Sequence, residues 1–140
     1  MNELIYTWDN FFNDAEKLAR VILPNKPQSL IVVTRGGLFL GALLSEYLNI
    51  PLIDTVCVSS YNEQERQVLK IIKEARYGLP NALIIDGIID SGETLKHLTE
   101  KYNTKSAALF YKPATAIIKP DYYLNETDKW VKFPWEVKPL

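Results

Sequence analysis

The sequence predicts an α/β fold in which a mostly parallel, twisted sheet is flanked by helices. Short β-branched runs alternate along its 140 residues with longer runs whose apolar residues recur at helical spacing. The length suits one domain, and 47% hydrophobic residues are enough to form a core. No repeat or linker divides the chain, so we expect residues 1–140 to form a single domain.

The first half of the chain shows the alternation directly. Residues 9–22 predict a helix, because apolar residues recur there at helical spacing and Pro24 and Pro27 follow. Residues 29–34, SLIVVT, predict a strand, since the run is β-branched and too short for a helix. Residues 38–48, LFLGALLSEYL, predict an apolar helix.

The second half continues the pattern. It is expected to contain a strand over 51–60, a polar connection over 62–80, a strand over 81–86, a helix ending near Tyr102, a strand over 105–111, and a tail from 112 of short strands and turns that form a small C-terminal hood. The repeated order of strand, loop, helix and strand implies parallel pairing. Ligands then bind at the carboxyl ends of the strands.

Charge and hydropathy argue against two classes of partner. Sixteen basic and seventeen acidic residues give a net charge of -1, and no basic stripe is present, so nucleic-acid binding is not expected. No apolar segment reaches the roughly 18 residues that a membrane span needs, and the N-terminus lacks an apolar signal core. We therefore expect a cytoplasmic protein without integral membrane contact.

The stretch LIIDGIIDSGETL, residues 83–95, combines two carboxylates with the features of an anion site. Asp86 is expected to end a strand and Asp90 to lie within the loop. Ser91 to Thr94 are expected to open a helix, whose first amides attract phosphate. The carboxylates could bind sugar hydroxyls, or Mg2+ held by phosphates. A capped turn without a ligand, with turn aspartates, is the alternative.

A second candidate anion site lies in VTRGGLFLGALL. Arg35 is expected at the end of the preceding strand, and Gly36 and Gly37 are expected to leave two backbone amides available. A tight turn with a surface arginine is the alternative. The stretch matches neither a Walker loop nor a dinucleotide fingerprint. Two anion sites on adjacent strand ends suggest one ligand that carries two phosphate groups.

These motifs carry a family resemblance. LIIDGIIDSGETL resembles the phosphoribosyl-pyrophosphate motif of the type I phosphoribosyltransferases, and TRGGLFLGALL resembles the pyrophosphate loop of their 6-oxopurine branch. YTWDNF, DTVCVSSY, YKPA and WVKFPWE are similar to the bacterial xanthine-guanine members. The resemblance implies transfer of a 5-phosphoribosyl group from phosphoribosyl pyrophosphate to a 6-oxopurine, with Mg2+ as cofactor. It also implies a homodimer or homotetramer.

The resemblance implies a role for each matching residue. Grouped by what they would bind, these are Arg35, Gly36 and Gly37 for pyrophosphate, Asp86 for the ribose hydroxyls and Mg2+, and Ser91, Gly92, Glu93 and Thr94 for the 5′-phosphate. Asp90 would act as general base at N7 of the purine. The Thr34–Arg35 peptide is expected to be cis. Arg66 and Lys70 would belong to a mobile loop over 62–78 that closes on the site, unless that stretch is a charged connection exposed to solvent.

Three further residues would select the base. Lys112 carries donors and no acceptor, so it can bond the exocyclic oxygen of a 6-oxopurine but not the amino group of adenine. Trp130 offers a flat face for stacking, and the backbone of Val131 could contact the edge of the base. The alternatives are a surface lysine and a core tryptophan. A pyrimidine acceptor fits Lys112 and Trp130 less well.

The chain departs from the family pattern at one position. The family usually has two adjacent acids at the start of its main motif, and here the second is Gly87. One ribose or metal contact is therefore missing. A catalytically weakened regulatory protein that binds nucleotides or phosphoribosyl pyrophosphate on the same fold is the second hypothesis. Asp90 and Lys112 favour the enzyme, because a sensor needs no proton acceptor at N7.

Overall fold

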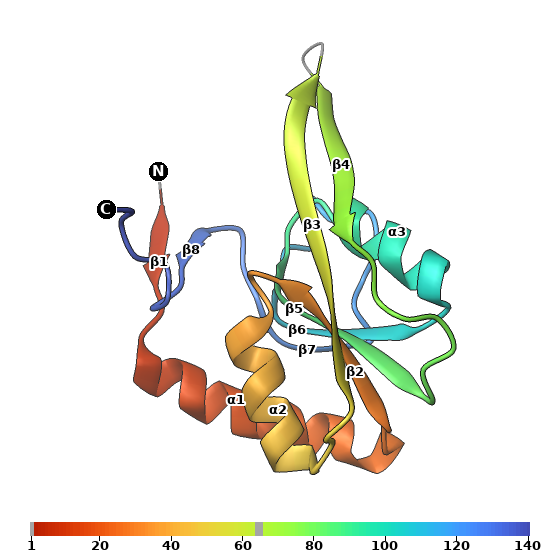
Figure 1. Ribbon diagram of the computed structural model, residues 1–140. Coiled ribbons are helices and arrows are strands. Elements are labelled where there is room, and N and C mark those ends of the chain that lie inside the picture. Colours follow the sequence, from red (N-terminus) through yellow and green to blue (C-terminus); the bar gives the residue numbers. More distant parts are fainter. Residues whose placement is uncertain (1, 64–65) are drawn as a thin grey trace.

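A six-stranded sheet organises the molecule, with strand order β4-β3-β2-β5-β6-β7 (Figure 1). The computed structural model describes residues 2–63 and 66–140, and side chains outside 60–67. The elements are β1 (Glu3–Ile5), α1 (Trp8–Ile22), the 3-10 helix η1 (Leu23–Asn25), β2 (Ser29–Thr34), α2 (Leu38–Leu48), β3 (Ile53–Glu63), β4 (Arg66–Lys73), β5 (Ala82–Ile89), α3 (Glu93–Tyr102), β6 (Lys105–Tyr111), β7 (Tyr122–Glu126) and β8 (Trp130–Lys132).

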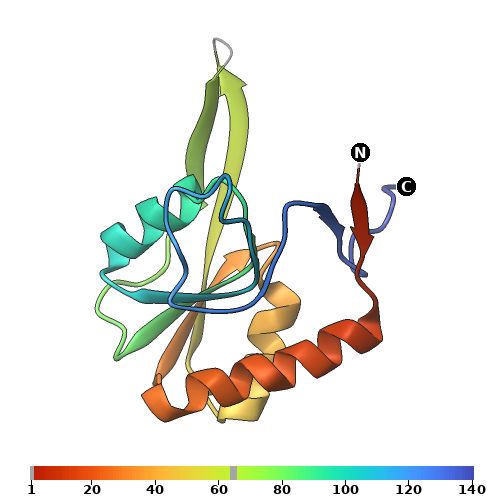
Figure 2. The ribbon, with the colours of Figure 1, turned by 180° about the vertical axis from the view of Figure 1, so that it is seen from behind.

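The predicted fold class is confirmed. Among the described residues of this sheet, strands β3, β2, β5, β6 and β7 pair in parallel, and only the edge strand β4 pairs antiparallel, with β3. Helices α1 and α2 cover one face of the sheet and α3 covers the other (Figures 1 and 2). None of the helices in the described part of the chain is long and apolar enough to cross a bilayer.

The apolar strands are explained by burial on both faces. In β2, Leu30 and Val32 pack into the core beneath α1 and α2, whereas Ile31 and Val33 pack into the core beneath α3. A strand that is covered on both sides needs apolar residues at every position, so its sequence shows no alternation. This arrangement fixes β2 and β5 as the centre of the sheet.

The hood differs from the expectation in one respect. Its strand β8 pairs in parallel with β1 from the N-terminus, with Leu4 opposite Val131. We use "hood" for β1, β8 and residues 133–135, which stand beside the main sheet (Figure 2). Tyr6 joins the hood to the sheet, since its ring lies 5.0 Å from Phe110 and 5.7 Å from Phe133, both edge-on. A three-residue strand is too short to show a period, which is why β1 was not predicted.

The prediction of a polar connection over residues 62–80 is wrong for the first part of that range, which belongs to a hairpin. Residues 66–73 form β4, which builds an antiparallel hairpin with a longer β3 than expected (Figure 1). Edge strands commonly carry lysine and other charged residues that prevent pairing with another chain. Residues 64–65 lie outside the described part. The strand predicted over 81–86 also continues to Ile89.

Helix α2 lies unusually close to β2. A Cβ atom added to Gly41 would lie 2.5 Å from Cγ2 of Val32, so only glycine fits here. Because α2 begins at Leu38, directly after residues 35–37, this contact also fixes the loop between β2 and α2.

Gly41→Ala should lower the free energy of unfolding by about 1–3 kcal/mol, because the added methyl overlaps Val32. This loss of stability should exceed the stabilisation of up to about 1 kcal/mol that alanine's higher helix propensity contributes. Denaturant unfolding measures the change. The double variant Gly41→Ala/Val32→Ala should recover part of the loss, and additive losses would show that the two positions are not in contact.

Candidate active site

The carboxyl ends of three central strands meet at one edge of the sheet. Val32 of β2 is opposite Ile85 of β5, and Ile89 of β5 is opposite Tyr111 of β6. The residues that follow these strands therefore lie at the same edge. They include Arg35, Asp90 and Lys112.

The loop after β2 has the predicted cis peptide between Thr34 and Arg35. Gly37 does not offer a free amide, however, since its N–H donates to the carbonyl of Val33 at 2.8 Å. A Cβ at Gly37 would lie 2.5 Å from the carbonyl oxygen of Ile85, so this glycine permits close contact with β5. Arg35 and Gly36 are exposed.

Asp86 lies within β5, opposite Ala108 of β6, and does not end the strand as expected. Its Oδ1 accepts a hydrogen bond from the Gly87 amide at 2.7 Å. Burial raises the pKa of Asp86 to about 7, and the bond from Gly87 opposes this only in part. Donors or a cation placed beside this carboxylate would therefore favour its ionised form.

Gly87 brings β5 into direct contact with the loop after β2. A Cβ at this position would lie 2.8 Å from the carbonyl oxygen of Gly36. A Cβ at Gly36 would in turn lie 3.1 Å from Oδ1 of Asp86. The position where the family usually has its second acid thus has no room for a side chain in this chain.

The loop between β5 and α3 encloses a pocket of about 130 Å³. The predicted residues that line it are Asp86, Asp90, Ser91, Gly92 and Thr94. The first hydrogen bond inside α3 runs from the Lys96 amide to Gly92, so the amides before Lys96 have no helical partner. The pocket is thus lined by possible donors and by two carboxylates.

Backbone geometry explains the glycine of this loop. Gly92 has a φ of 78°, a left-handed conformation that side chains rarely adopt. A Cβ here would also lie 3.0 Å from Cγ2 of Ile118. Glu93, predicted with this group, is exposed and does not line the pocket.

Lys112 and Trp130 gather beside Asp90. Nζ of Lys112 lies 3.5 Å from Oδ2 of Asp90 and 5.9 Å from the centre of the Trp130 ring. Lys112 is only 9% exposed, so it is not an ordinary surface lysine. Trp130 is 54% exposed, so it is not a core residue and its ring remains accessible. Val131 is buried in the hood.

Sequence reasoning missed several residues of the site. Thr115 donates its hydroxyl to the backbone carbonyl of Asp90 at 3.0 Å, and its Oγ1 lies 3.2 Å from Oδ1 of Asp90. It directly follows the YKPA motif, whose turn is closed by bonds from Thr115 and Ala116 back to Lys112. The apolar pocket residues that were also missed are Ile88, Ile89 and Leu95.

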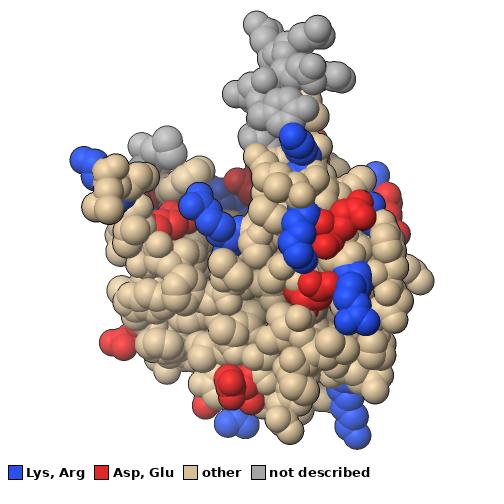
Figure 3. All heavy atoms as spheres, in the orientation of Figure 1, with Lys and Arg blue, Asp and Glu red and all other residues tan. Residues whose placement is uncertain are grey.

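The predicted mobile-loop residues lie on the hairpin. Lys70 is exposed on β4, opposite Ser59 of β3, and has no hydrogen bond to the site within the described residues. The backbone of Arg66 begins β4, and its side chain lies outside the described part. Figure 3 shows charged side chains of both signs around a notch between the hood and the hairpin.

The carboxylates of the site suit Mg2+ only when a bound phosphate supplies further oxygen ligands to the ion. No group of three or more histidine, cysteine, aspartate or glutamate side chains that could hold a metal occurs among the described residues. Asp86 and Asp90 nevertheless line one pocket. Mg2+ is commonly held by one or two carboxylates plus substrate phosphates, so these two residues fit that mode of binding.

Comparisons with known proteins extend over the whole chain. The family model of the phosphoribosyl transferase domain matches residues 1–140. The purine phosphoribosyltransferase of Pyrococcus horikoshii is 30% identical, with 100% of this chain and 97% of that chain covered and a TM-score of 0.89. The Helicobacter pylori xanthine-guanine-hypoxanthine phosphoribosyltransferase is also 30% identical, with 96% and 94% covered and a TM-score of 0.82.

A third solved structure shares the fold alone. A Neisseria gonorrhoeae protein, described as hypothetical and with bound ppGpp, is 21% identical to this chain. The match covers 98% of this chain and 91% of that chain, with a TM-score of 0.82.

The raised pKa of Asp86 predicts a pH dependence of stability. Between its ordinary value of 3.8 and about 7, the folded protein retains a proton that the unfolded chain has released. The free energy of unfolding should therefore fall as the pH rises through this window, by about 1.4 kcal/mol per unit of pKa shift at most. Asp86→Asn should remove this dependence, as measured by urea unfolding of the ligand-free protein at several pH values.

The exposed Asp128 provides the matched control, and Asp128→Asn should keep the wild-type slope. Identical slopes for Asp86→Asn and the wild type would mean that Asp86 ionises normally in the folded protein.

Gly87→Asp should not restore the family's second acid. Its Cβ would meet the Gly36 carbonyl, so the variant should lose about 1–3 kcal/mol of stability and bind Mg2+-pyrophosphate no better than the wild type. Gly87→Ala should lose a similar amount, because the cause is the Cβ and not the charge. Denaturant unfolding and calorimetric titration measure the two effects. A stable Gly87→Asp protein with tighter binding would contradict the steric explanation.

Proposed function

This chain belongs to the phosphoribosyl transferase domain family, and from that premise we propose that it is a purine-salvage enzyme specific for 6-oxopurines. It moves the 5-phosphoribosyl group from phosphoribosyl pyrophosphate to guanine, xanthine or hypoxanthine and releases pyrophosphate. The observation that carries this proposal is the position of Asp90. Its carboxylate lines the candidate phosphate pocket and lies 3.5 Å from Lys112, the proposed base-binding residue.

The 5′-phosphate is bound by the loop that begins α3. The backbone amides before Lys96, together with the hydroxyls of Ser91 and Thr94, supply donors at the positive end of the helix. Gly92 allows the backbone to approach the phosphate closely. Glu93 would contribute its amide, which donates to Oγ of Ser91 at 3.3 Å in the ligand-free protein, whereas its side chain does not line the pocket.

Asp86 binds the ribose hydroxyls. Its carboxylate is half-buried, and the hydroxyls replace water as donors to it. Asp86 and Asp90 would also hold Mg2+ together with the phosphates of the substrate, and the ion would supply positive charge beside the departing pyrophosphate. In the reaction the bond from ribose C1′ to pyrophosphate breaks, and a bond from C1′ to a purine nitrogen forms.

The charges of the site suit that reaction. Positive charge grows on the ribose as the bond to pyrophosphate breaks, and Asp86 and Asp90 would stabilise it. Negative charge grows on the pyrophosphate, which the loop of Arg35, Gly36 and Gly37 would bind. Arg35 donates to the leaving group, whereas Gly37 shapes the loop. Asp90 accepts the proton from N7 of the purine.

Base selection rests on three residues. Lys112 donates to the exocyclic oxygen at position 6, which adenine lacks. Trp130 stacks on the purine, because its accessible ring lies near Lys112. Val131 contacts the edge of the base through its backbone. Thr115 places its hydroxyl against Asp90, since Oγ1 lies 3.0 Å from the backbone carbonyl oxygen and 3.2 Å from Oδ1 of that residue.

The hairpin of β3 and β4 closes over the bound substrates. Arg66 and Lys70 lie on β4 and bring positive charge toward the pyrophosphate when the hairpin bends. Closure excludes water, which would otherwise hydrolyse the activated sugar.

We further propose that the chain is a single cytoplasmic domain that forms a homodimer or homotetramer, without nucleic-acid or integral membrane partners. Support for self-association comes from apolar side chains exposed on α1 and α2, namely Phe12, Val21, Leu38, Phe39 and Tyr47. Large exposed apolar side chains such as these can become buried when subunits associate.

A regulatory protein on the same fold is the alternative. The contact between Gly36 and Gly87 favours it, because it removes the space for a second acid beside Asp86. Such a protein would bind phosphoribosyl pyrophosphate or nucleotides without turnover. An activity assay separates the two functions.

Incubation with Mg2+, phosphoribosyl pyrophosphate and a single base should yield nucleotide and pyrophosphate with guanine, xanthine or hypoxanthine, and little with adenine or uracil. Asp90→Asn should lower kcat about 10²–10⁴-fold, because a general base is lost, while nucleotide affinity changes much less. Chromatography of the nucleotide and calorimetric titration measure these effects.

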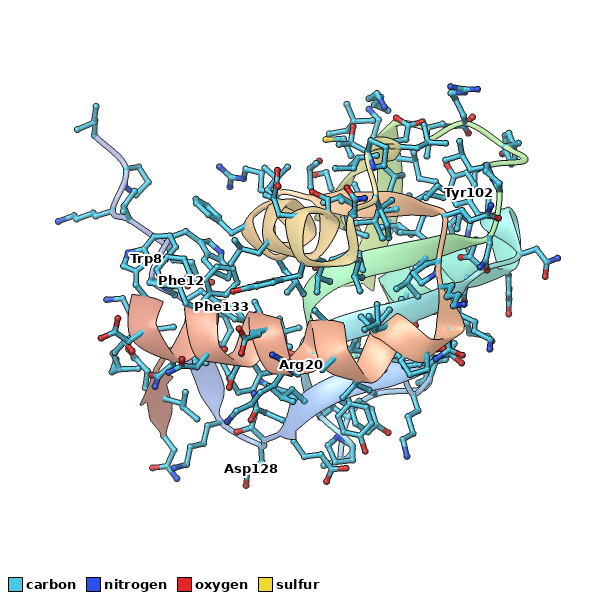
Figure 4. The ribbon with its side chains drawn as sticks, turned by 90° about the horizontal axis from the view of Figure 1, so that it is seen from below. Trp8, Phe12, Arg20, Tyr102, Asp128 and Phe133 are labelled. Atoms are coloured by element: carbon cyan, nitrogen blue, oxygen red, sulfur yellow. The ribbon has the colours of Figure 1, made fainter. Side chains whose placement is uncertain are left out.

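Asp128→Asn serves as the matched control, because its carboxylate points away from the body of the molecule in Figure 4. No nucleotide from any base, together with retained binding of phosphoribosyl pyrophosphate, would support the regulatory function instead.

A further inference from the structure

A second, larger cavity lies at the amino-terminal ends of the central strands, whereas the candidate active site lies at their carboxyl ends. Its volume is about 340 Å³, and the amino-terminal ends of β5, β6 and β7 contribute Ala82, Lys105 and Tyr122 to its lining. The candidate active site lies at the other end of β5, from Asp86 onward. Figure 4 places Tyr102, which also lines this cavity, at the far end of the molecule from Trp8 and from Phe133 of the hood.

The lining combines an apolar, aromatic body with positive charge. Ile22, Leu79 and Leu83 supply apolar surface, and Tyr102 and Tyr122 supply aromatic surface. Of the charged lining residues within the described part of the chain, Arg76 and Lys105 are basic and none is acidic. Both basic residues are exposed. A negatively charged group is therefore the one whose charge the cavity complements.

The walls are held by hydrogen bonds between distant segments. The hydroxyl of Tyr102 on α3 accepts from the amide of Ala75 at 2.9 Å. The side chain of Asn81 donates to the carbonyl of Lys26 at 2.9 Å, and Ser29 donates to the carbonyl of Pro80 at 2.7 Å. These bonds join the segment before β5 to α3, to the start of β2 and to the segment before β2. The cavity is thus a built feature of the fold and not a gap beneath a loose loop.

One lining residue has an unsatisfied polar atom. Oγ1 of Thr104 is buried and has no hydrogen-bond partner among the described residues. A buried polar atom without a partner lowers stability, and native proteins contain few of them. Thr104 lines the cavity with other atoms, since its hydroxyl oxygen has almost no accessible surface and lies behind the cavity wall.

We propose that this cavity is a second small-molecule site, which binds an aromatic ring that carries a carboxylate or a phosphate. The ring packs on the tyrosine and aliphatic wall, and the anionic group binds Arg76 and Lys105. The volume of about 340 Å³ lies at the lower end of the roughly 300–1,000 Å³ typical of ligand pockets, so it suits a compact ligand.

Four probes of similar size test the charge and the chemistry of the ligand. They are benzoate, phenyl phosphate, benzyl alcohol and benzylamine, titrated separately into the full chain labelled with ¹⁵N. Benzoate, phenyl phosphate or both should shift the amide signals of Asn81, Asn103 and Thr104 at low millimolar concentration. They should bind at least fivefold more tightly than benzyl alcohol, and benzylamine should bind most weakly. The preferred anion distinguishes a carboxylate ligand from a phosphate ligand.

Variants of the lining separate this site from the candidate active site. Arg76→Gln should weaken anion binding at least fivefold, whereas Arg20→Gln on the outer face of α1 should leave it unchanged (Figure 4). Thr104→Val should keep or raise the stability of the ligand-free protein, because it removes an unsatisfied hydroxyl. Thr99→Val, which removes a bonded hydroxyl on α3, is its control.

The proposal is overturned if neither anion shifts the cavity amides, or if benzyl alcohol and benzylamine bind as tightly as the anions. It is also overturned if the anions shift only the amides of residues 90–95, which would assign their binding to the candidate active site.

Discussion

The contact between the loop after β2 and the middle of β5 is the constraint on which the candidate site depends. Gly36, Gly37 and Gly87 allow the two backbones to approach until any added Cβ atom would meet a carbonyl oxygen or the carboxylate of Asp86. This approach places Asp86 between two loops that the sequence marks as anion sites. Because close packing leaves little room for adjustment, the positions of both loops are set by the core beneath them.

The same contact helps to bury Asp86 and so affects the protonation of its carboxylate. Asp86 is buried enough to raise its pKa to about 7, so ligand donors or a cation change its protonation near neutral pH. Asp90 has a different environment, since it is exposed and lies beside Lys112 and Thr115. Two carboxylates in one pocket can thus serve different purposes, one toward the sugar and one toward the base. In the proposed mechanism, this difference in environment divides their roles.

Much of this arrangement could be predicted from the sequence, because the information was local. Helical spacing predicted α1, a short β-branched run predicted β2, and apolar runs predicted α2 and β6, all nearly at their observed bounds. The family motifs predicted the cis peptide and most of the pocket residues. The rest depends on contacts between distant segments. The pairing of β1 with β8, the bond that occupies the Gly37 amide and the lack of space at Gly87 leave no local pattern. The hairpin strand β4 was missed because its charged residues also suit a loop.

The most direct test of the account is a crystal structure of the protein with GMP, pyrophosphate and Mg2+. The account predicts the 5′-phosphate at the amides of residues 91–94, the ribose hydroxyls at Asp86, the guanine between Trp130 and Lys112, and pyrophosphate at Arg35. Phosphate density away from the β5–α3 loop, or a base remote from Lys112, would contradict it.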